Sequence, residues 1–298
     1  MLKADVMAAV QLFHITGSLP KGCNASFIAL IPKVRDSSSL DQFRPISLVG
    51  VIYKIITKVL SSRMKIIMPL IIDECQSAFI CGRGLLDSVV MANEVLEDVK
   101  RNGKSGVCFM VDFEKAYDSV RWSFLFDMLP RLGFHDKWIS WVKGCLVSSS
   151  VSVLVNGSTE EFKPSRGLRQ GDPMAPFLFL VVVEGLTGLV IQVLITNVLM
   201  GLKVGRNNIE CCLLQFADDT LFMCEDTFDN IFAIKAILHC YEIVSGLKVN
   251  FHKSKLSGIK VDGFALSTYA KTLNCKTMKL PFQYLGVEVG GNLRKIQF

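Results

Sequence analysis

The chain has 298 residues, half of them hydrophobic and a fifth charged, a composition that supports a folded core and excludes a largely disordered chain. Its net charge of +6 is uneven: residues 1–66 carry nine Lys/Arg against three Asp/Glu, residues 67–245 carry 15 against 22, and residues 246–298 carry nine against two. Ten scattered cysteines without a C-x-x-C pair argue against a disulfide scaffold, and indicate reduced thiols in an intracellular, non-secreted protein.

The first hundred residues are predicted to form one strand and two helices. Residues 24–34 read as a strand that leads into a serine-rich loop. Residues 46–68 are apolar at helical spacing, and Pro69 is expected to end this helix. A second helix is expected over residues 87–101, stopped by Asn102-Gly103.

Strands and helices alternate in the rest of the chain. Apolar patterns and turn residues predict a buried strand at 107–112, a helix at 122–132, a hairpin of 151–155 with 161–163 that turns at Asn156-Gly157, a helix over most of 173–199, strands at 211–216 and 221–224, a helix at 227–245 stopped by Gly246, and strands at 248–251 and 284–289. This order predicts an α+β fold in which an antiparallel sheet has helices behind one face.

One apolar stretch is long enough to suggest a membrane span. Between residues 174 and 202 the one ionisable side chain is that of Glu184. Pro176 and this charge interrupt the stretch, and basic and aromatic anchors do not flank it on both sides. We therefore expect a buried helix and no membrane partner.

Three carboxylates stand where a bare charge is unfavourable. Asp112 ends the buried strand, and Asp218 and Asp219 are adjacent in a tight turn between two strands. If these strands are neighbours, the three side chains meet at one rim, where two Mg²⁺ ions about 3.5–4 Å apart could clamp the oxygens of a phosphoryl transfer. Taken alone, the Asp-Asp turn is also compatible with a simple polar hairpin tip.

Eight segments in order then resemble a known family. The A, B and C motifs of reverse transcriptases resemble residues 111–120 (VDFEKAYDSV), 167–176 (GLRQGDPMAP) and 216–219 (FADD). The motif sequences look most like those of LINE-type non-LTR retrotransposons of plants. The supporting segments are LIPK at 30–33 with FRPISL at 43–48, QSAF at 76–79 with Gly82-Arg83, GLKVNFHKSK at 246–255, and YLG at 284–286. The resemblance runs from about Leu19 to the end of the chain.

The resemblance implies an RNA-directed DNA polymerase, with fingers and palm of a right-hand fold. It assigns the metal ions (Mg²⁺, with Mn²⁺ as a substitute) to Asp112, Asp218, Asp219 and the backbone carbonyl of Phe113. For the incoming nucleotide, the resemblance implies Tyr117 as the gate against ribose, Gln170 and Gly171 beside the nucleotide, and Lys33 and Arg44 on the triphosphate. It implies Lys253 (or Lys255) as the proton donor to the pyrophosphate leaving group. For the template and primer, it implies Lys54, Lys58 and Arg63 on template phosphates, and Tyr284, Leu285 and Gly286 near the primer end.

Some features depart from the family's pattern. Met110 stands where lysine is frequent, and Phe216 where tyrosine is commoner. The chain ends soon after the last matching segment, so we expect a truncated domain with the thumb largely missing. The expected layout is a helical lead-in at 1–18 and a reverse transcriptase domain at 19–298, with 19–106 mainly fingers and 107–298 mainly palm.

The expected partners follow from the same resemblance. They are an RNA template, a DNA primer and deoxynucleoside triphosphates; no stable protein partner can be inferred, and the family suggests the nucleus as the compartment. Two alternatives stay open: a catalytically silent, nucleic-acid-binding remnant of a retrotransposon polyprotein, and a pseudogene product without a function of its own. A related RNA-synthesising polymerase is disfavoured by Tyr117.

Overall fold

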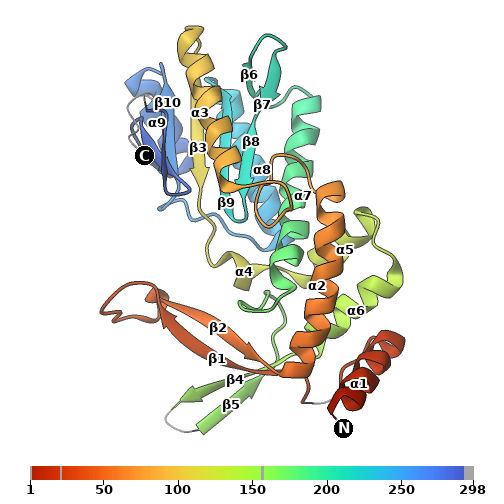
Figure 1. Cartoon of the computed structure of the whole chain (residues 1–298). Coiled ribbons are helices and arrows are strands. Elements are labelled where there is room, and N and C mark those ends of the chain that lie inside the picture. Colours follow the sequence, from red (N-terminus) through yellow and green to blue (C-terminus); the bar gives the residue numbers. More distant parts are fainter. Residues whose placement is uncertain (1, 21, 156–157, 292–298) are drawn as a thin grey trace. The chain divides into compact units, whose positions relative to one another are not determined.

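The structure is a computed structural model that describes residues 2–20, 22–155 and 158–291 (Figure 1). The chain forms two compact units that alternate along the sequence. The first unit comprises Met1–Ile71 and Tyr117–Val182, and the second comprises Ile72–Ala116 and Val183–Phe298. Residues 72–106 thus belong to one unit with residues 183–298, and the expected division into fingers and palm stays a prediction.

The first unit contains a four-stranded sheet of order β2-β1-β4-β5. Strand β1 (Ala25–Pro32) pairs antiparallel with β2 (Phe43–Val49) and parallel with β4 (Ser150–Val155), which in turn pairs antiparallel with β5 (Ser158–Phe162). The predicted hairpin is therefore confirmed, whereas its turn at Asn156-Gly157 lies outside the described residues.

Helices make up the rest of the first unit. They are α1 (Leu2–Thr16), the short 3-10 helix η1 (Leu40–Gln42), α2 (Val51–Ile71), α4 (Ala116–Ser119, which begins one residue before the boundary), α5 (Trp122–Arg131) and α6 (Asp136–Val147). The sequence did not predict α6.

The bounds predicted for the helix at 46–68 were wrong at both ends. Residues Ile46–Val49 are strand residues that pair with β1, so the helix begins only after Gly50. Pro69 lies inside α2 and does not end it, because a proline in the last turn removes one backbone hydrogen bond without displacing the turns before it. Antiparallel pairing therefore overrides the apolar spacing at the start of this segment.

The second unit contains a five-stranded sheet of order β11-β10-β3-β9-β8. Its strands are β3 (Gly106–Val111), β8 (Leu213–Phe216), β9 (Asp219–Glu225), β10 (Lys255–Ile259) and β11 (Lys276–Thr277), and every pairing except β10 with β11 is antiparallel. Two hairpins accompany the sheet: β6 (Leu202–Val204) with β7 (Ile209–Cys211), and β12 (Phe282–Tyr284) with β13 (Val287–Val289).

Three helices of the second unit pack on this sheet: α3 (Leu85–Arg101), α8 (Phe228–Ser245) and α9 (Gly263–Leu273). Residues Ala92 and Leu96 of α3 share a buried cluster with Cys108 of β3 and with Leu221 and Met223 of β9. Helix α8 lies behind the sheet in Figure 1. The predicted fold class, α+β with an antiparallel sheet and packed helices, is confirmed.

Two predicted strands took other forms. Residues 248–251 make a single bridge, Phe113 to Val249, and not a strand. Residues 284–289 are divided by a turn in which Leu285 and Gly286 have φ angles of +52° and +80°. A left-handed Leu-Gly pair reverses the chain, so the apolar run becomes parts of two strands.

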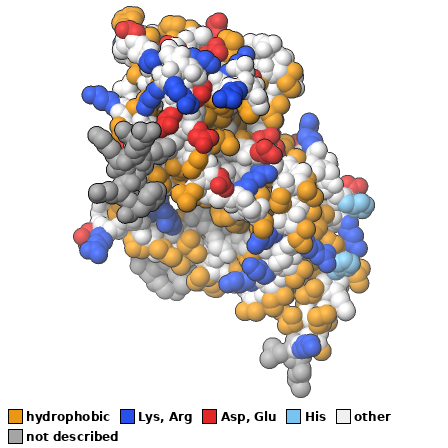
Figure 2. All heavy atoms as spheres, turned by 45° about the horizontal axis from the view of Figure 1, so that its top comes forward, with side chains coloured by type: hydrophobic (Ala, Val, Ile, Leu, Met, Phe, Trp, Pro, Cys, Tyr) orange, Lys and Arg blue, Asp and Glu red, His pale blue; other side chains and the backbone are white. Residues whose placement is uncertain are grey.

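Helix α7 (Ala175–Ile195) confirms the helix predicted for the long apolar stretch. It is the one helix in the described part of the chain that is long and apolar enough to cross a membrane by length and composition, and half of its most hydrophobic window is buried inside the protein. Hydrophobic side chains also occupy much of the visible surface, between Lys, Arg, Asp and Glu (Figure 2). Length and hydropathy therefore do not distinguish α7 from a core helix.

Glu184 on α7 gives a pH-dependent contribution to stability. Its carboxyl accepts a hydrogen bond from the amide of Asp73 at 3.2 Å, and burial, followed by repulsion from Asp73, raises its pKa to about 7. The folded protein then holds a proton that the unfolded chain releases at lower pH, so the free energy of unfolding falls as pH rises from about 4.5 to about 7.

We predict that Glu184→Gln removes this pH dependence. The variant should gain on the order of 2 kcal/mol relative to wild type at pH 8, after discounting for partial solvent access, and little at pH 4.5. Urea unfolding at both pH values measures it. Equal differences at the two pH values would contradict the assigned burial of the charge.

Candidate active site

The register of two strands brings distant carboxylates to one edge of the sheet. Strands β3 and β9 pair antiparallel up to Val111 opposite Thr220. Asp112 comes directly after Val111 and Asp219 directly before Thr220, so these two residues occupy the next position of the same register. Side chains of opposed residues project to the same face of a sheet, about 4.5–5.5 Å apart at Cβ. Asp112 and Asp219 thus converge, although 107 positions separate them in the sequence.

Asp218 joins this edge from the turn between β8 and β9. Ala217, directly before it, has a φ of +55°. This left-handed conformation costs an alanine about 1–2 kcal/mol, so neighbouring groups must hold it in place. The turn places Asp218 beside the strand end that carries Asp219, as the sequence predicts.

The three carboxylates repel one another. Burial is the largest cause that raises the pKa of each, and Asp218 further raises the pKa of Asp112. For Asp219, burial together with Asp218 and Asp112 raises the pKa to about 6. The charged forms are therefore unfavourable unless a cation accompanies them.

Lys253 is one cation close to this edge. Its charge lowers the pKa of Asp112 in opposition to burial. The turn that carries it is attached to the strand end: the amide of Asn250 donates to the carbonyl of Asp112 at 2.7 Å, and the amide of Asp112 donates to the hydroxyl of Ser254 at 3.1 Å. Lys255, the other possibility, lies in β10 opposite Met110, two residues back from Asp112.

The backbone of Phe113 is oriented by its bridge to Val249. In this bridge the carbonyl of Asp112 accepts from the amide of Asn250, and the amide of Glu114 donates to the carbonyl of Lys248 at 2.8 Å. In this arrangement the carbonyl of Phe113 points away from residues 248–250. The bridge does not use this carbonyl as an acceptor, so its oxygen fits the expected role of an additional metal ligand.

The donor set at this edge fits a hard divalent cation. Among the described residues, no group of three or more His, Cys, Asp or Glu side chains is arranged to enclose an ion. Mg²⁺ does not require such an enclosure, since it is usually held by one or two carboxylates while phosphates and water complete its shell. Carboxylates of raised pKa, open to solvent at a strand end, match that mode of binding.

Tyr117, the predicted gate against ribose, packs within the first unit. Tyr117 stacks on Phe179 of α7, with ring centroids 4.6 Å apart and planes 9° apart, and remains partly exposed. Its carbonyl accepts from the amide of Leu168 at 2.7 Å, while the amide of Gly167 donates to Val120. A Cβ at Gly167 would lie 2.7 Å from the carbonyl oxygen of Asp118, so this close approach requires glycine.

The loop that carries Gln170 and Gly171 also contacts strand β2. The amide of Ser47 donates to the carbonyl of Gln170 at 2.8 Å. Gly171 has a φ of +96°, and a Cβ there would lie 3.2 Å from the carbonyl of Ser47. The glycine thus lets the loop approach the strand while Gln170 stays partly exposed.

Sequence reasoning missed the buried group that holds this loop. Asp172 accepts a hydrogen bond from the hydroxyl of Tyr53, and Arg169 lies 3.7 Å from its carboxylate and 4.2 Å from the centre of the Tyr53 ring. Asp172 and Tyr53 come from positions 119 residues apart. The sequence shows that Arg169 and Asp172 carry opposite charges three residues apart in a loop with two glycines, but this spacing does not indicate that Tyr53 contacts them.

Lys33 and Arg44 lie on one face of the β1–β2 hairpin. Arg44 pairs with Ile31 in the register, and Lys33 follows two residues later, where its amide donates to the carbonyl of Gln42. Because side chains alternate along a strand, Lys33 and Arg44 project to the same face as diagonal neighbours. Both are exposed, which suits a shared anionic ligand.

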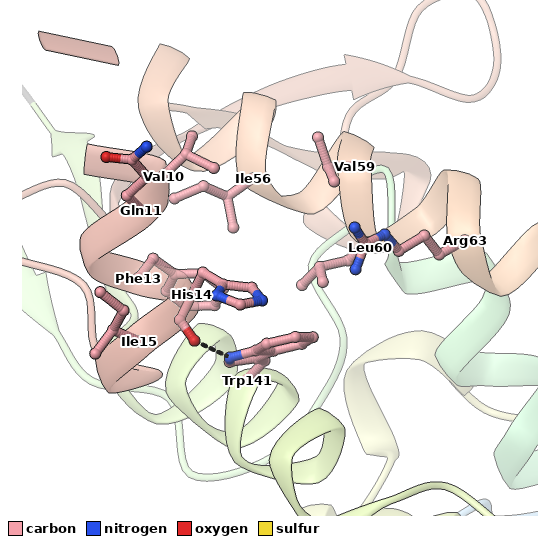
Figure 3. Close-up of a pocket in the computed structure, with 10 residues that line it drawn as sticks. All are labelled: Val10, Gln11, Phe13, His14, Ile15, Ile56, Val59, Leu60, Arg63 and Trp141. Carbon is pink, nitrogen blue, oxygen red and sulfur yellow. Dashed lines mark hydrogen bonds between the residues drawn. The ribbon is translucent and has the colours of Figure 1, made fainter. Parts of the chain in front are cut away.

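The exposed side of α2 carries the three cations predicted for the template. Lys54, Lys58 and Arg63 are all exposed there, and they border an apolar groove that Val51, Ile55 and Val59 also line. A second cavity of about 430 Å³ lies between α1, α2 and α6, with Val59 and Arg63 at its edge (Figure 3). In this cavity Trp141 donates to the carbonyl of His14 at 3.2 Å.

The side chain of Tyr284 is buried, and its expected place near the primer end stays a prediction. Tyr284 is only 1% exposed and belongs to the buried cluster that α3 forms with the sheet. Its neighbours Leu285 and Gly286 form the turn between β12 and β13, and Gly286 is exposed. The buried ring is thus not available for direct contact with a ligand, whereas Gly286 in the turn is.

Comparison with known proteins agrees with these features. Residues 31–289 match the family described as "Reverse transcriptase (RNA-dependent DNA polymerase)". The chain is 29% identical over 253 residues to the "Transposon TX1 uncharacterized 149 kDa protein" of Xenopus laevis, covering 83% of this chain and 19% of that protein. It is 29% identical over 256 residues to the Pol polyprotein of the retrotransposable element R2DM of Drosophila melanogaster, covering 86% and 23%.

A third relative and the solved structures extend the comparison. The Pol polyprotein of the element R2 of Popillia japonica is 26% identical over 287 residues, covering 93% of this chain and 39% of that protein. The chain thus spans about two fifths or less of these relatives. A structure of apo telomerase from Candida tropicalis has a TM-score of 0.60 at 13% identity, over 86% of this chain and 55% of that chain. A structure of telomerase from Candida albicans in complex with a fragment of telomeric RNA has a TM-score of 0.59 at 14% identity, over 90% of this chain and 45% of that chain. These two likenesses concern the fold.

We predict that Asp219→Asn stabilises the metal-free protein at pH 8. The substitution removes one of three mutually repelling charges, so the melting temperature should rise by about 2–4 °C, and Mg²⁺ should then raise it less than in wild type. Glu97→Gln, which neutralises an exposed carboxylate on α3, is the matched control and should change neither value. A variant that melts lower than wild type without metal would argue against repulsion at this edge.

Proposed function

The chain belongs to the reverse transcriptase family, and from this we propose that it catalyses RNA-directed DNA synthesis, extending a primer 3′-hydroxyl with deoxynucleotides. The observation that supports the proposal most is the convergence of Asp112 with Asp219 at the end of a shared register. A pair of buried strands that ends in repelling carboxylates has no advantage for stability. It is useful where a reaction needs divalent cations.

We infer that the carboxylate edge binds two Mg²⁺ ions. Asp112, Asp218, Asp219 and the carbonyl of Phe113 would hold them, and the bound ions would supply charge neutralisation for the triphosphate and the attacking oxygen. The protein's own contribution is to keep these groups in position before the substrate arrives. The β3–β9 register and the bridge from Phe113 to Val249 provide that positioning.

Lys253 is the proposed proton donor to the pyrophosphate leaving group. It is exposed, and its charge acts on Asp112. Its turn is attached to Asp112 by two hydrogen bonds, from the amide of Asn250 to the carbonyl of Asp112 and from the amide of Asp112 to the hydroxyl of Ser254, so the backbone that carries Lys253 is held in place. Lys255 is the less suitable candidate, because it belongs to a paired strand and lies two positions further from the rim.

The first unit would select and hold the nucleotide. We propose Tyr117, fixed by its stack on Phe179, as the gate that disfavours a ribose 2′-hydroxyl, and Gln170 with Gly171 as the surface beside the incoming nucleotide. Lys33 and Arg44 would bind the triphosphate from the hairpin face that they share. A guanidinium suits bidentate contact with phosphate oxygens, and an ammonium acts as a point charge.

The template would be an RNA that lies along α2. Lys54 and Lys58 are one turn apart on the exposed side of the helix, where like charges repel unless an anion lies between or above them. Apolar side chains between the cations could contact sugars and bases. The turn at Leu285 and Gly286 is the accessible part of the segment proposed to approach the primer.

The similarity to Pol polyproteins of retrotransposable elements suggests where this domain belongs. We propose that it is the reverse transcriptase part of a non-LTR retrotransposon of a plant, and that it acts inside the cell, where such elements meet nuclear DNA. In that setting the reduced thiols expected from the sequence would persist; all ten cysteines are unpaired.

The primary test is extension of a DNA primer on an RNA template. We predict that Asp218→Asn lowers the rate at least about 10³-fold with little change in primer–template affinity, because it removes a group that acts on the reacting charges. Glu97→Gln should retain the wild-type rate. Extension that survives Asp218→Asn would reject the metal-ligand assignment, and tight binding without extension by wild type would identify a silent remnant.

Salt dependence tests the template assignment. We predict that the double variant Lys54→Gln/Lys58→Gln binds a primer–template hybrid more weakly, and that the slope of log affinity against log salt becomes less steep by about 1 to 2. Fluorescence anisotropy over a range of salt concentrations measures both. The matched control is Lys203→Gln/Arg206→Gln, which removes two exposed cations from the β6–β7 hairpin. Equal slopes for the two double variants would contradict the assignment.

A further inference from the structure

The turn that carries Asp218 depends on a conformation that alanine rarely adopts. Ala217 has a φ of +55° in the turn between β8 and β9, directly before Asp218. Glycine would adopt this conformation readily, whereas an alanine keeps it only when surrounding groups fix it. The direction in which Asp218 leaves the turn follows from this one backbone torsion.

Gln76 holds both polar backbone groups of Ala217. Its side-chain oxygen accepts from the amide of Ala217 at 2.9 Å, and its side-chain nitrogen donates to the carbonyl of Ala217 at 3.4 Å. The same oxygen accepts from the amide of Ala78 at 2.9 Å. Gln76 is 1% exposed, so water does not compete for these groups. A carboxamide is suited to this contact, because it presents a donor and an acceptor at one end.

The segment that presents Gln76 is itself fixed to the sheet. Gln76 forms a parallel bridge with Gln215 of β8, in which Gln215 donates to the carbonyl of Cys75 at 2.8 Å and Ser77 donates to the carbonyl of Gln215 at 3.0 Å. Arg83 then donates to the carbonyl of Gln76 at 2.8 Å and to that of Ile72 at 3.1 Å. The side chain that contacts the turn therefore comes from a rigid base.

We propose that Gln76 is a positioning residue for the metal-binding turn, and that its carboxamide fixes Ala217 so that Asp218 and Asp219 face Asp112. This inference rests on the proposed function, since the geometry that it protects is that of the carboxylate edge. It gives a role to the QSAF…GR segment at residues 76–83, to which the carboxylate chemistry assigns none. Gln76 is buried and acts through the backbone of Ala217.

A purely structural role for Gln76 is the alternative, and a neighbouring glutamine distinguishes the two. Gln215 is 0% exposed and lies in the same bridge, but its side-chain oxygen accepts from the hydroxyl of Thr187 at 3.1 Å rather than from the turn. Gln215→Met therefore perturbs the same buried region without removing the contact to Ala217. Gln76→Met, of similar length and without hydrogen-bonding groups, removes that contact.

The experiment compares wild type, Gln76→Met and Gln215→Met in primer extension on an RNA template. We expect Gln76→Met to lower kcat by about 10–100-fold, as for a small misplacement of a catalytic group, with KM for the deoxynucleotide changed less than about threefold. Gln215→Met should keep kcat within about threefold of wild type. Equal losses of kcat in the two variants, or none in Gln76→Met, would overturn the proposal.

Hydrogen exchange provides a readout that does not require activity. In Gln76→Met the amide of Ala217 loses its acceptor, so peptides that contain residue 217 should exchange at least about tenfold faster than in Gln215→Met at matched melting temperature. If wild type does not extend a primer at all, the proposed function fails, and exchange alone decides whether Gln76 fixes the turn. Equal exchange in the two variants rejects it. If Gln76→Met does not fold, Gln76→Glu takes its place in primer extension alone, because it keeps the acceptor for the amide of Ala217 and loses the donor to its carbonyl. A kcat within about threefold of wild type in that variant would overturn the proposal.

Discussion

The repulsion among three carboxylates at one edge of an antiparallel sheet is the constraint on which the candidate site depends. The β3–β9 pairing forces Asp112 and Asp219 to the same face, and burial and mutual repulsion raise the pKa of each. Packing alone would favour apolar residues at these positions, or one charged residue instead of three. The protein instead places three carboxylates where the strands end and solvent or a ligand can reach them, so a bound cation would relieve the electrostatic cost.

Irregular backbone, and not the sheet, completes the geometry around that edge. Ala217 and Gly171 both have positive φ angles, and each is fixed by hydrogen bonds or close contacts from a segment distant in sequence. In each case a motif residue lies on a loop whose shape is imposed by a buried polar partner: Gln76 in the second unit, and Asp172 with Tyr53 in the first. Buried polar groups of this kind are expensive to leave unpaired, and they therefore select one loop conformation over its alternatives.

The sequence predicted those parts of the fold that local pattern controls. The buried strand before Asp112, the helix that Gly246 ends and the hairpin around residue 156 follow from apolar runs and turn residues, and the structure contains all three. The start of α2 was missed because Ile46–Val49 fit a helical pattern but pair with β1, and pairing between strands is not visible in a local window. The burial of Tyr284 was missed for a related reason: a motif predicts proximity to a ligand, whereas burial of a ring depends on what packs against it.

The contacts that sequence reasoning could not supply are those between a side chain and a distant backbone group. Gln76 was recognised as part of a motif, yet nothing in its own segment indicates that its carboxamide reaches Ala217, 141 residues later. The amide and carbonyl of residue 217 would be satisfied by the same partner whatever side chain stood there, so the sequence around Asp218 carries no trace of the contact. A glutamine distant in sequence from the catalytic carboxylates can therefore affect catalysis by fixing the position of one of them. The positive φ angle of Ala217 is the structural sign that such a partner is required.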